Sequence, residues 1–180
     1  MNTRLTEIPK TTLTDRRTAT AEVLFVDDYE AMRTFVRAVL ERNGYRCTTA
    51  ANSAEARKCL GEQMFDLAVL DVTMPGESGL ALAKSIRTDY PHTAVMMATA
   101  VDDLRTADSA LKAGVYGYLV KPFEANQLLI NVAGVLDRRR LEKEGQQQRN
   151  ELKRLVRTRT LHVRDSLHTF CARPMFAGRD

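Results

Sequence analysis

Short apolar runs of strand length alternate with helical patterns between residues 22 and 136. The runs recur every 21 to 27 residues and begin near Val23, Arg46, Leu67, Ala94 and Tyr116. Strands that alternate with helices at this spacing predict a parallel sheet with helices on both faces. We therefore expect an α/β fold, a doubly wound sheet of five parallel strands with right-handed crossovers.

Helical signals fill the segments between these runs. Asn52 followed by Glu55 is typical of a capping box, and Gly114 stands where a glycine ends a helix. The first helix is expected to carry an apolar stripe of Met32, Phe35, Val36, Val39 and Leu40. The last is expected to begin near Glu124 and to bury Leu128, Leu129, Val132, Val135 and Leu136.

The chain outside residues 22–136 lacks this alternation. Residues 1–21 are rich in threonine and arginine without a hydrophobic period, which predicts a disordered lead-in. Residues 137–165 hold one glycine and no proline, so they predict a long basic helical or coiled-coil extension. Residues 166–180 change character abruptly and predict an irregular tail.

The net charge of +4 is unevenly spread. Residues 22–136 carry eleven basic and fifteen acidic groups, whereas residues 137–164 carry ten basic and four acidic groups. A basic helix of this kind suits nucleic acid or an acidic membrane surface. No helix-turn-helix pattern follows it and no aromatic residues interleave it, so a solvated helix is favoured and nucleic acid is not the expected partner.

Nothing in the sequence predicts a membrane span or export. The longest apolar runs, such as Val23–Val26 and Ala94–Ala98, are far short of the roughly 20 residues that a span needs. The N-terminus has no apolar core of a signal peptide. The three cysteines, Cys47, Cys59 and Cys171, show no ligand spacing, which favours a reducing cytoplasm.

Chargeable and polar residues stand at the carboxyl ends of four of the five predicted strands. Asp27 and Asp28 follow the first strand, Asp71 the third, Thr99 the fourth and Lys121 the fifth. Carboxyl ends of parallel strands meet at one edge, where ligands bind. Each residue alone is more often a cap, a turn former or a surface group. Their joint placement favours a site.

Three crowded carboxylates repel one another, and a divalent cation relieves that repulsion. Ligation by oxygen atoms alone suits Mg²⁺, which can bridge carboxylate and phosphoryl oxygens. Carboxylates form aspartyl phosphates, so Asp71 is the expected nucleophile. Asp27 and Asp28 would hold the metal, and Thr99 and Lys121 would bind phosphoryl oxygens.

Four stretches together resemble the receiver domain of bacterial two-component response regulators, over about residues 22–136. They are "VLFVDDYEAMR", "DLAVLDVTMPGESG", "MATA" and "AGVYGYLVKPF". The resemblance implies a flavodoxin-like fold with strand order 2-1-3-4-5. It also implies that Asp71 accepts a phosphoryl group from a sensor histidine kinase or a phosphotransfer protein. Direct Mg²⁺ ligands would be Asp28, Asp71 and the backbone carbonyl of Thr73, with Asp27 acting mainly through water.

The same resemblance implies a switch. Thr99 and Lys121 would bind the phosphoryl group, and Tyr118 would move inward when Thr99 moves. The bond between Lys121 and Pro122 is expected to be cis. The responding face, formed by helix four, strand five and helix five, would dock a partner or a second copy, and it includes Ala107, Leu111, Tyr116 and Tyr118.

Such a switch is a signalling module and not an enzyme. A competing hypothesis is a magnesium-dependent phosphotransferase of the haloacid-dehalogenase type. Those enzymes need a second acid two residues after the nucleophile, where this chain has Thr73.

The tail leaves three hypotheses open, and one of them is a nucleic-acid-binding regulator that acts through the basic tail. "RRRLEKE" and "ELKRLVRTRT" resemble the linker of HD-GYP-type cyclic-di-GMP phosphodiesterase regulators, yet no HD pair or GYP triplet follows. The chain is then either a truncated relative that lacks its output domain, or a stand-alone receiver whose tail forms a homodimer. In the second case Gly145 interrupts an imperfect a/d pattern.

Overall fold

The computed structural model describes residues 20–100 and 114–171, with side chains described as far as residue 154. The chain divides into two compact units, residues 1–136 and residues 137–180. The predicted lead-in lies almost wholly outside the described residues, as do Ala107, Leu111 and the helix expected around them.

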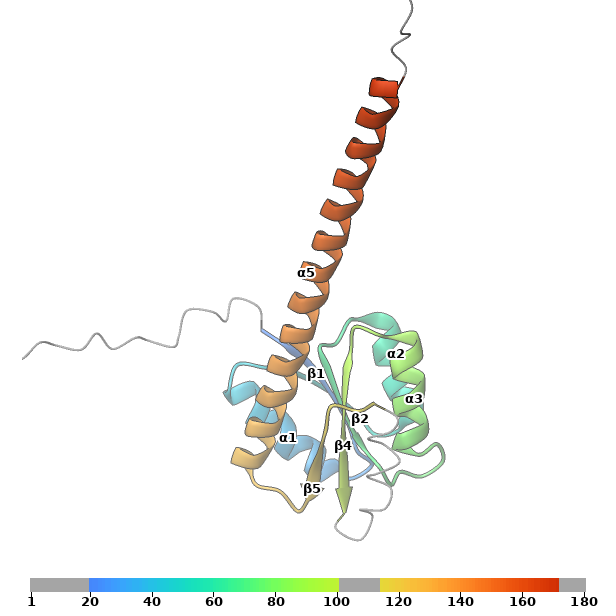
Figure 1. The fold of residues 1–180 in the computed structure, drawn as a ribbon. Helices are drawn as coiled ribbons and strands as arrows, with labels where there is room; N and C mark the ends of the chain where they lie inside the picture. The colour runs from blue at the N-terminus through green and yellow to red at the C-terminus, as the bar shows by residue number, and fades with distance from the viewer. Residues whose placement is uncertain (1–19, 101–113, 172–180) are drawn as a thin grey trace, which may run out of the picture. The chain divides into compact units, whose positions relative to one another are not determined.

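The first unit is built on one sheet of five parallel strands (Figure 1). The strands are β1 (Glu22–Val26), β2 (Arg46–Ala50), β3 (Leu67–Asp71), β4 (Ala94–Ala100) and β5 (Gly117–Lys121). Their order is β2-β1-β3-β4-β5, which confirms the predicted fold class and the order implied by the family resemblance. All five residues of β3 are buried, as expected of the central strand of a sheet covered on both faces.

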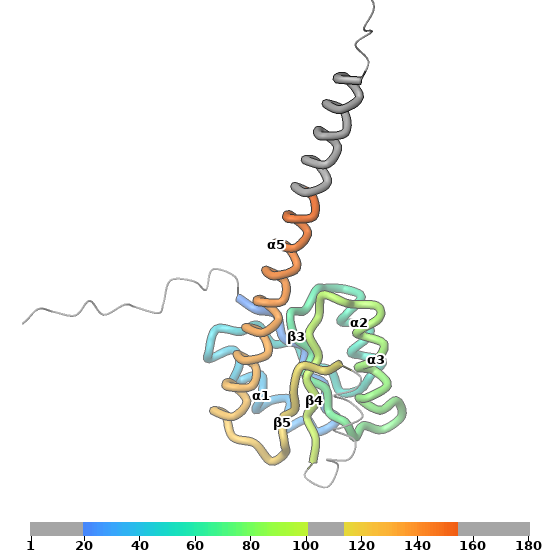
Figure 2. The backbone as a smooth tube through the Cα atoms, in the orientation of Figure 1, coloured from blue at the N-terminus to red at the C-terminus, as the bar shows by residue number. Residues whose placement is uncertain are grey.

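Helices cover both faces of the sheet (Figure 2). They are α1 (Glu30–Arg42), α2 (Ser53–Glu62), α3 (Gly79–Asp89) and α5 (Ala125–Cys171). One core cluster joins residues of α2 and α3 to the sheet. The other joins α1 and the first turns of α5 to the opposite face.

The predicted helix signals are largely confirmed. Asn52 accepts a hydrogen bond from the backbone N–H of Glu55, whose carboxylate in turn accepts from the N–H of Ala51. Gly114 has a φ of 76°, a left-handed conformation that favours glycine, but the helix that it is expected to end lies outside the described residues. Phe35 departs from the predicted stripe, because its side chain stays 38% exposed and its ring lies against that of Phe123.

The end of α5 differs from the predicted boundary at residue 165. The helix extends to Cys171, because residues 166–171 contain neither proline nor glycine to end it. Gly145 does not break the helix either, since one glycine costs only about 1 kcal/mol relative to alanine. Within residues 20–100 and 114–171, no helix is long and apolar enough to cross a membrane.

Candidate acidic site at the carboxyl edge of the sheet

Asp71 is the last residue of β3, and its carboxylate is nearly enclosed. The residue is 7% exposed, and its neighbour across the sheet is Ala98 of β4. The chain then turns back, and the N–H of Gly79 donates to the carbonyl of Val72 at 3.2 Å. A Cβ atom at position 79 would lie 1.8 Å from the Asp71 carbonyl oxygen. Glycine therefore allows α3 to begin directly against the backbone of Asp71.

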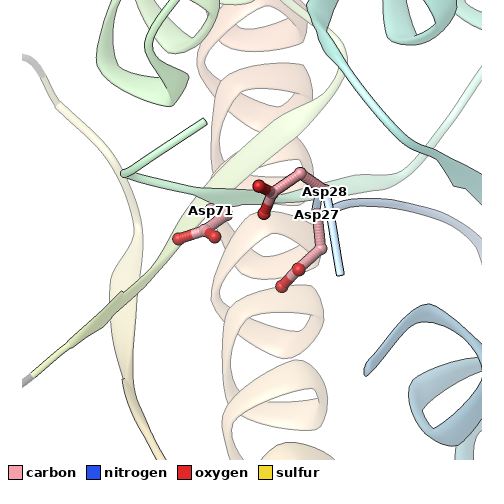
Figure 3. Close-up of side chains that lie close together, drawn as sticks. All are labelled: Asp27, Asp28 and Asp71. Carbon is pink, nitrogen blue, oxygen red and sulfur yellow. The ribbon is translucent and has the colours of Figure 1, made fainter. Parts of the chain in front are cut away.

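Asp27 and Asp28 bring two more carboxylates to this edge from the end of β1 (Figure 3). Each of the three residues offers an oxygen, and these oxygens lie within 4.8 Å of one another. Asp27 is fully buried, and its carboxylate accepts the N–H of Tyr29 at 2.9 Å. Asp28 is exposed, so the cluster opens to solvent on its side.

Lys121, the last residue of β5, joins the two buried carboxylates. Its Nζ atom lies 2.6 Å from Oδ2 of Asp27 and 2.8 Å from Oδ2 of Asp71. Burial raises the pKa of Asp71, and the hydrogen bond and charge of Lys121 offset this only in part. Burial alone would lower the pKa of Lys121, but its bonds to Asp27 and Asp71 outweigh burial and raise it.

The donor set fits Mg²⁺. Three ionised carboxylates and one ammonium leave a net charge of −2, which a divalent cation would neutralise. All candidate ligand atoms are oxygens, the preference of this ion. The N–H of Thr73 donates to Oδ1 of Asp71 at 3.3 Å, so this residue lies beside the cluster. That its carbonyl is a ligand stays a prediction.

Thr99 and Tyr118 lie within strands of the same sheet. Thr99 is the penultimate residue of β4 rather than the residue after it, and its hydroxyl donates to the carbonyl of Ala100 at 3.2 Å. Tyr118 pairs in register with Met97 and is partly buried against the core. The switch roles of both residues stay predictions, whereas the cis bond between Lys121 and Pro122 is confirmed.

Sequence reasoning missed Arg33. Its Nη1 atom donates to the backbone carbonyls of Asp27, at 2.7 Å, and Asp28, at 2.9 Å. Side chains in a helix lean toward its N-terminus, so an arginine one turn into the helix reaches back to the preceding loop. Its acceptors are backbone carbonyls, which every residue offers, so the sequence carried no specific signal for these contacts.

A second group of contacts holds the loop after Asp71 and was also missed. The hydroxyl of Ser53 donates to the backbone carbonyl of Glu77 at 3.0 Å. Arg57 donates to Oε1 of Glu77 at 2.7 Å and to the hydroxyl of Ser85 at 3.0 Å. These residues tie the start of α2 to the loop that leads from β3 into α3.

Comparison with known families decides the assignment. The family model of the response regulator receiver domain matches residues 23–133. The chain belongs to this family. It is therefore a receiver domain protein of the two-component response regulators, as the sequence motifs predicted.

Individual relatives agree. The chain is 40% identical to the protein PetR of Rhodobacter capsulatus over 116 residues, which cover 64% of this chain and 48% of PetR. NtrX of Brucella abortus superposes with a TM-score of 0.69 at 29% identity, covering 71% of this chain and 30% of NtrX. The chemotaxis response regulator CheY4 of Vibrio cholerae superposes with a TM-score of 0.61 at 33% identity, covering 65% of this chain and 99% of CheY4.

The chain spans less than half the length of the curated relatives it matches. The matches to PetR and NtrX are therefore matches to part of each protein. The resemblance of the tail to an HD-GYP linker stays a prediction.

Proposed function

We propose that Asp71 accepts a phosphoryl group, in a magnesium-dependent reaction, from a histidine kinase or a phosphotransfer protein. One observation carries this proposal: the Asp71 carboxylate lies 2.8 Å from the ammonium of Lys121, with two further carboxylates beside it. Membership in the receiver family supports it. The chain would act as a switch that binds partners and would not turn over a substrate of its own.

In the proposed transfer, a carboxylate oxygen of Asp71 forms a bond to phosphorus. The bond from phosphorus to the donor nitrogen breaks, and the donor imidazole keeps the electron pair and takes up a proton. Lys121 would donate to a phosphoryl oxygen, and the hydroxyl of Thr99 would do the same. Asp27, Asp28 and Asp71 would hold Mg²⁺, which when bound neutralises charge on the phosphoryl oxygens.

The proposed readout lies on β5 and its neighbours. A phosphoryl group adds negative charge and acceptor oxygens at the end of β3. Thr99 would turn toward it and Tyr118 would fill the space, shifting the population of the face around β5. The partial burial of Tyr118 against the core is compatible with such a move.

The extension of α5 supports a second copy of the chain as a partner. Leu141 and Leu152 are 61% and 62% exposed. They stand eleven residues apart, close to three helical turns, so they share one face of the helix. Contact with the same face of another copy would cover them. The cytoplasmic location stays a prediction.

The test uses acetyl phosphate and Mg²⁺ as the phosphodonor mixture. Phosphoryl incorporation is measured for the native chain, for Asp71→Asn and for Asp66→Asn. Asp66 precedes the same strand and accepts the N–H of Glu22, so it is an acid at the opposite end of β3. We expect incorporation in the native chain and in Asp66→Asn, and none in Asp71→Asn.

Light scattering on the native chain and on Leu141→Asp/Leu152→Asp tests the dimer. We expect the mass of a dimer for the native chain and that of a monomer for the variant. The mass of a dimer in both would remove the exposed leucines as the contact. Incorporation that persists in Asp71→Asn would remove Asp71 as the acceptor.

A further inference from the structure

Arg33 makes contacts that neither capping nor burial of α1 requires. It stands in the second turn of a helix that begins at Glu30, and its side chain reaches back past the first turn. One nitrogen, Nη1, serves two acceptors, the carbonyls of Asp27 and Asp28. These two carbonyls belong to consecutive residues that also supply carboxylates to the acidic cluster.

The dipole of α1 on its own makes this location unfavourable for a cation, whereas the acidic cluster beside it favours one. The first turns of a helix present the positive end of its dipole, where acidic side chains are favoured and basic ones are not. Glu30 follows that preference, and Arg33 opposes it. Hydrogen bonds from a charged donor to two carbonyls offset the cost.

We propose that Arg33 is a positioning residue that fixes the acidic loop, residues 27–29, for metal binding. Because Arg33 holds backbone oxygens, it does not compete with a metal for the carboxylate oxygens. It also keeps Asp28 next to Asp71 against the repulsion of their charges. The loop is then already in place when the ion arrives, which lowers the ordering cost of binding. The metal part of this inference rests on the proposed function.

Arg37 supplies a matched control on the same helix. It stands one turn farther along α1, and its guanidinium donates to the hydroxyl of Thr49 on β2 instead of to the acidic loop. Arg33→Lys and Arg37→Lys both keep the charge and lose the planar guanidinium. A difference between them therefore reports the contacts to the loop and not the charge of α1.

The first measurement is hydrogen exchange in the metal-free protein. The N–H of Tyr29 donates to Asp27 and reports whether the loop is fixed. In Arg33→Lys its exchange should accelerate about tenfold, the scale expected when a charged hydrogen bond is lost. Exchange of the buried Leu70 amide should stay unchanged, and Arg37→Lys should match the native protein.

Arg33→Met removes the charge as well and should accelerate exchange at Tyr29 at least as much. Two results overturn the inference: exchange at Tyr29 that equals the native rate in both variants, or acceleration that Leu70 shares equally. The second result would mean that Arg33 stabilises the whole unit and not the loop.

The second measurement is calorimetric titration with magnesium chloride. The dissociation constant for Mg²⁺ should rise about fivefold or more in Arg33→Lys and stay unchanged in Arg37→Lys. Equal constants in the native protein and Arg33→Lys would overturn the metal part of the inference alone. If the native protein binds no Mg²⁺, the proposed function fails, and the exchange result still decides whether Arg33 fixes the loop.

Discussion

Three leucines of α5, all within the part whose side chains the structure describes, stand in two different environments. Leu128, in the first turns, is fully buried against the sheet, whereas Leu141 and Leu152 are mostly exposed. The first part of the helix is thus held by a core to which four strands and α1 contribute buried residues. The second part, residues 137–154, has no such core in the described chain, so other interactions have to stabilise its helix.

Local interactions supply those means. Arg138 bonds to Glu142, and Arg140 approaches Glu144, both four residues apart on the helix. Exposed pairs of this kind stabilise a helix by only about 0.2–0.5 kcal/mol each. The comparison teaches that one continuous helix combines a part fixed by burial with a part fixed by propensity and charge. Four predictions test that division.

The largest effect is expected at Leu128. Leu128→Ala removes a fully buried side chain and should lower the free energy of unfolding by about 3 kcal/mol. Leu152→Ala removes the same atoms from an exposed position and, in protein dilute enough to be monomeric, should change it by less than about 0.5 kcal/mol. All five tyrosines lie between residues 29 and 118, so tyrosine fluorescence in urea follows the first unit. Equal losses in both variants would contradict the division of α5.

Two glycines give the next comparison. A Cβ at position 79 would collide with the backbone of Asp71, so Gly79→Ala should destabilise the first unit by about 2 kcal/mol. A Cβ at Gly145 would meet nothing within 4 Å, so Gly145→Ala should raise helicity and stabilise the helix by up to about 1 kcal/mol. Urea denaturation and circular dichroism measure the two effects. If Gly79→Ala unfolds at the same urea concentration as the native protein, the start of α3 does not depend on its close approach to the backbone of Asp71.

Mg²⁺ should stabilise the first unit and should leave the helix of residues 137–171 unchanged. At a concentration tenfold above its dissociation constant, Mg²⁺ should stabilise the first unit by about 1.4 kcal/mol, measured by tyrosine fluorescence. The helical signal of residues 137–171 should not respond. Asp28→Asn removes one exposed carboxylate of the cluster and should reduce the stabilisation. If Mg²⁺ stabilises Asp28→Asn as much as the native protein, Asp28 does not take part in binding the ion.

Removing a surface ion pair should have the smallest effect on the free energy of unfolding. The effect should be similar in the first unit and in the extension of α5. Arg138→Ala breaks the pair with Glu142, and Arg46→Ala breaks the pair with Glu22 in the first unit. Each should change the free energy of unfolding by less than about 0.5 kcal/mol, because water screens exposed charges. A loss of about 2 kcal/mol or more from Arg138→Ala would mean that this pair, and not propensity, holds the helix.

The fold could be predicted because its signals are local and regular. Runs such as Leu67–Leu70 are apolar throughout, and a parallel sheet brings the residues at the carboxyl ends of its strands to one edge. That rule predicts that Asp27, Asp71 and Lys121 stand at the same edge, and the ion pairs of Lys121 with both carboxylates confirm that they meet there. The strand order does not come from periodicity; the family resemblance implied it, and the sheet confirms it.

Other features could not be predicted because they depend on geometry that spacing does not contain. The contacts of Arg33 are to backbone carbonyls, which carry no residue signature. Phe35 fits the periodic stripe but stands at its margin, where Phe123 covers only part of it. The end of α5 at Cys171 has no stop signal before it, so composition placed the boundary too early.

The most direct test of the central claim is to locate the phosphoryl group. The native chain is phosphorylated with acetyl phosphate and Mg²⁺, digested, and mapped by mass spectrometry under conditions that preserve acyl phosphates. The account predicts one hydroxylamine-sensitive phosphoryl group, on Asp71. Phosphate on Asp27 or Asp28, or a hydroxylamine-resistant group on a hydroxyl side chain, would contradict it.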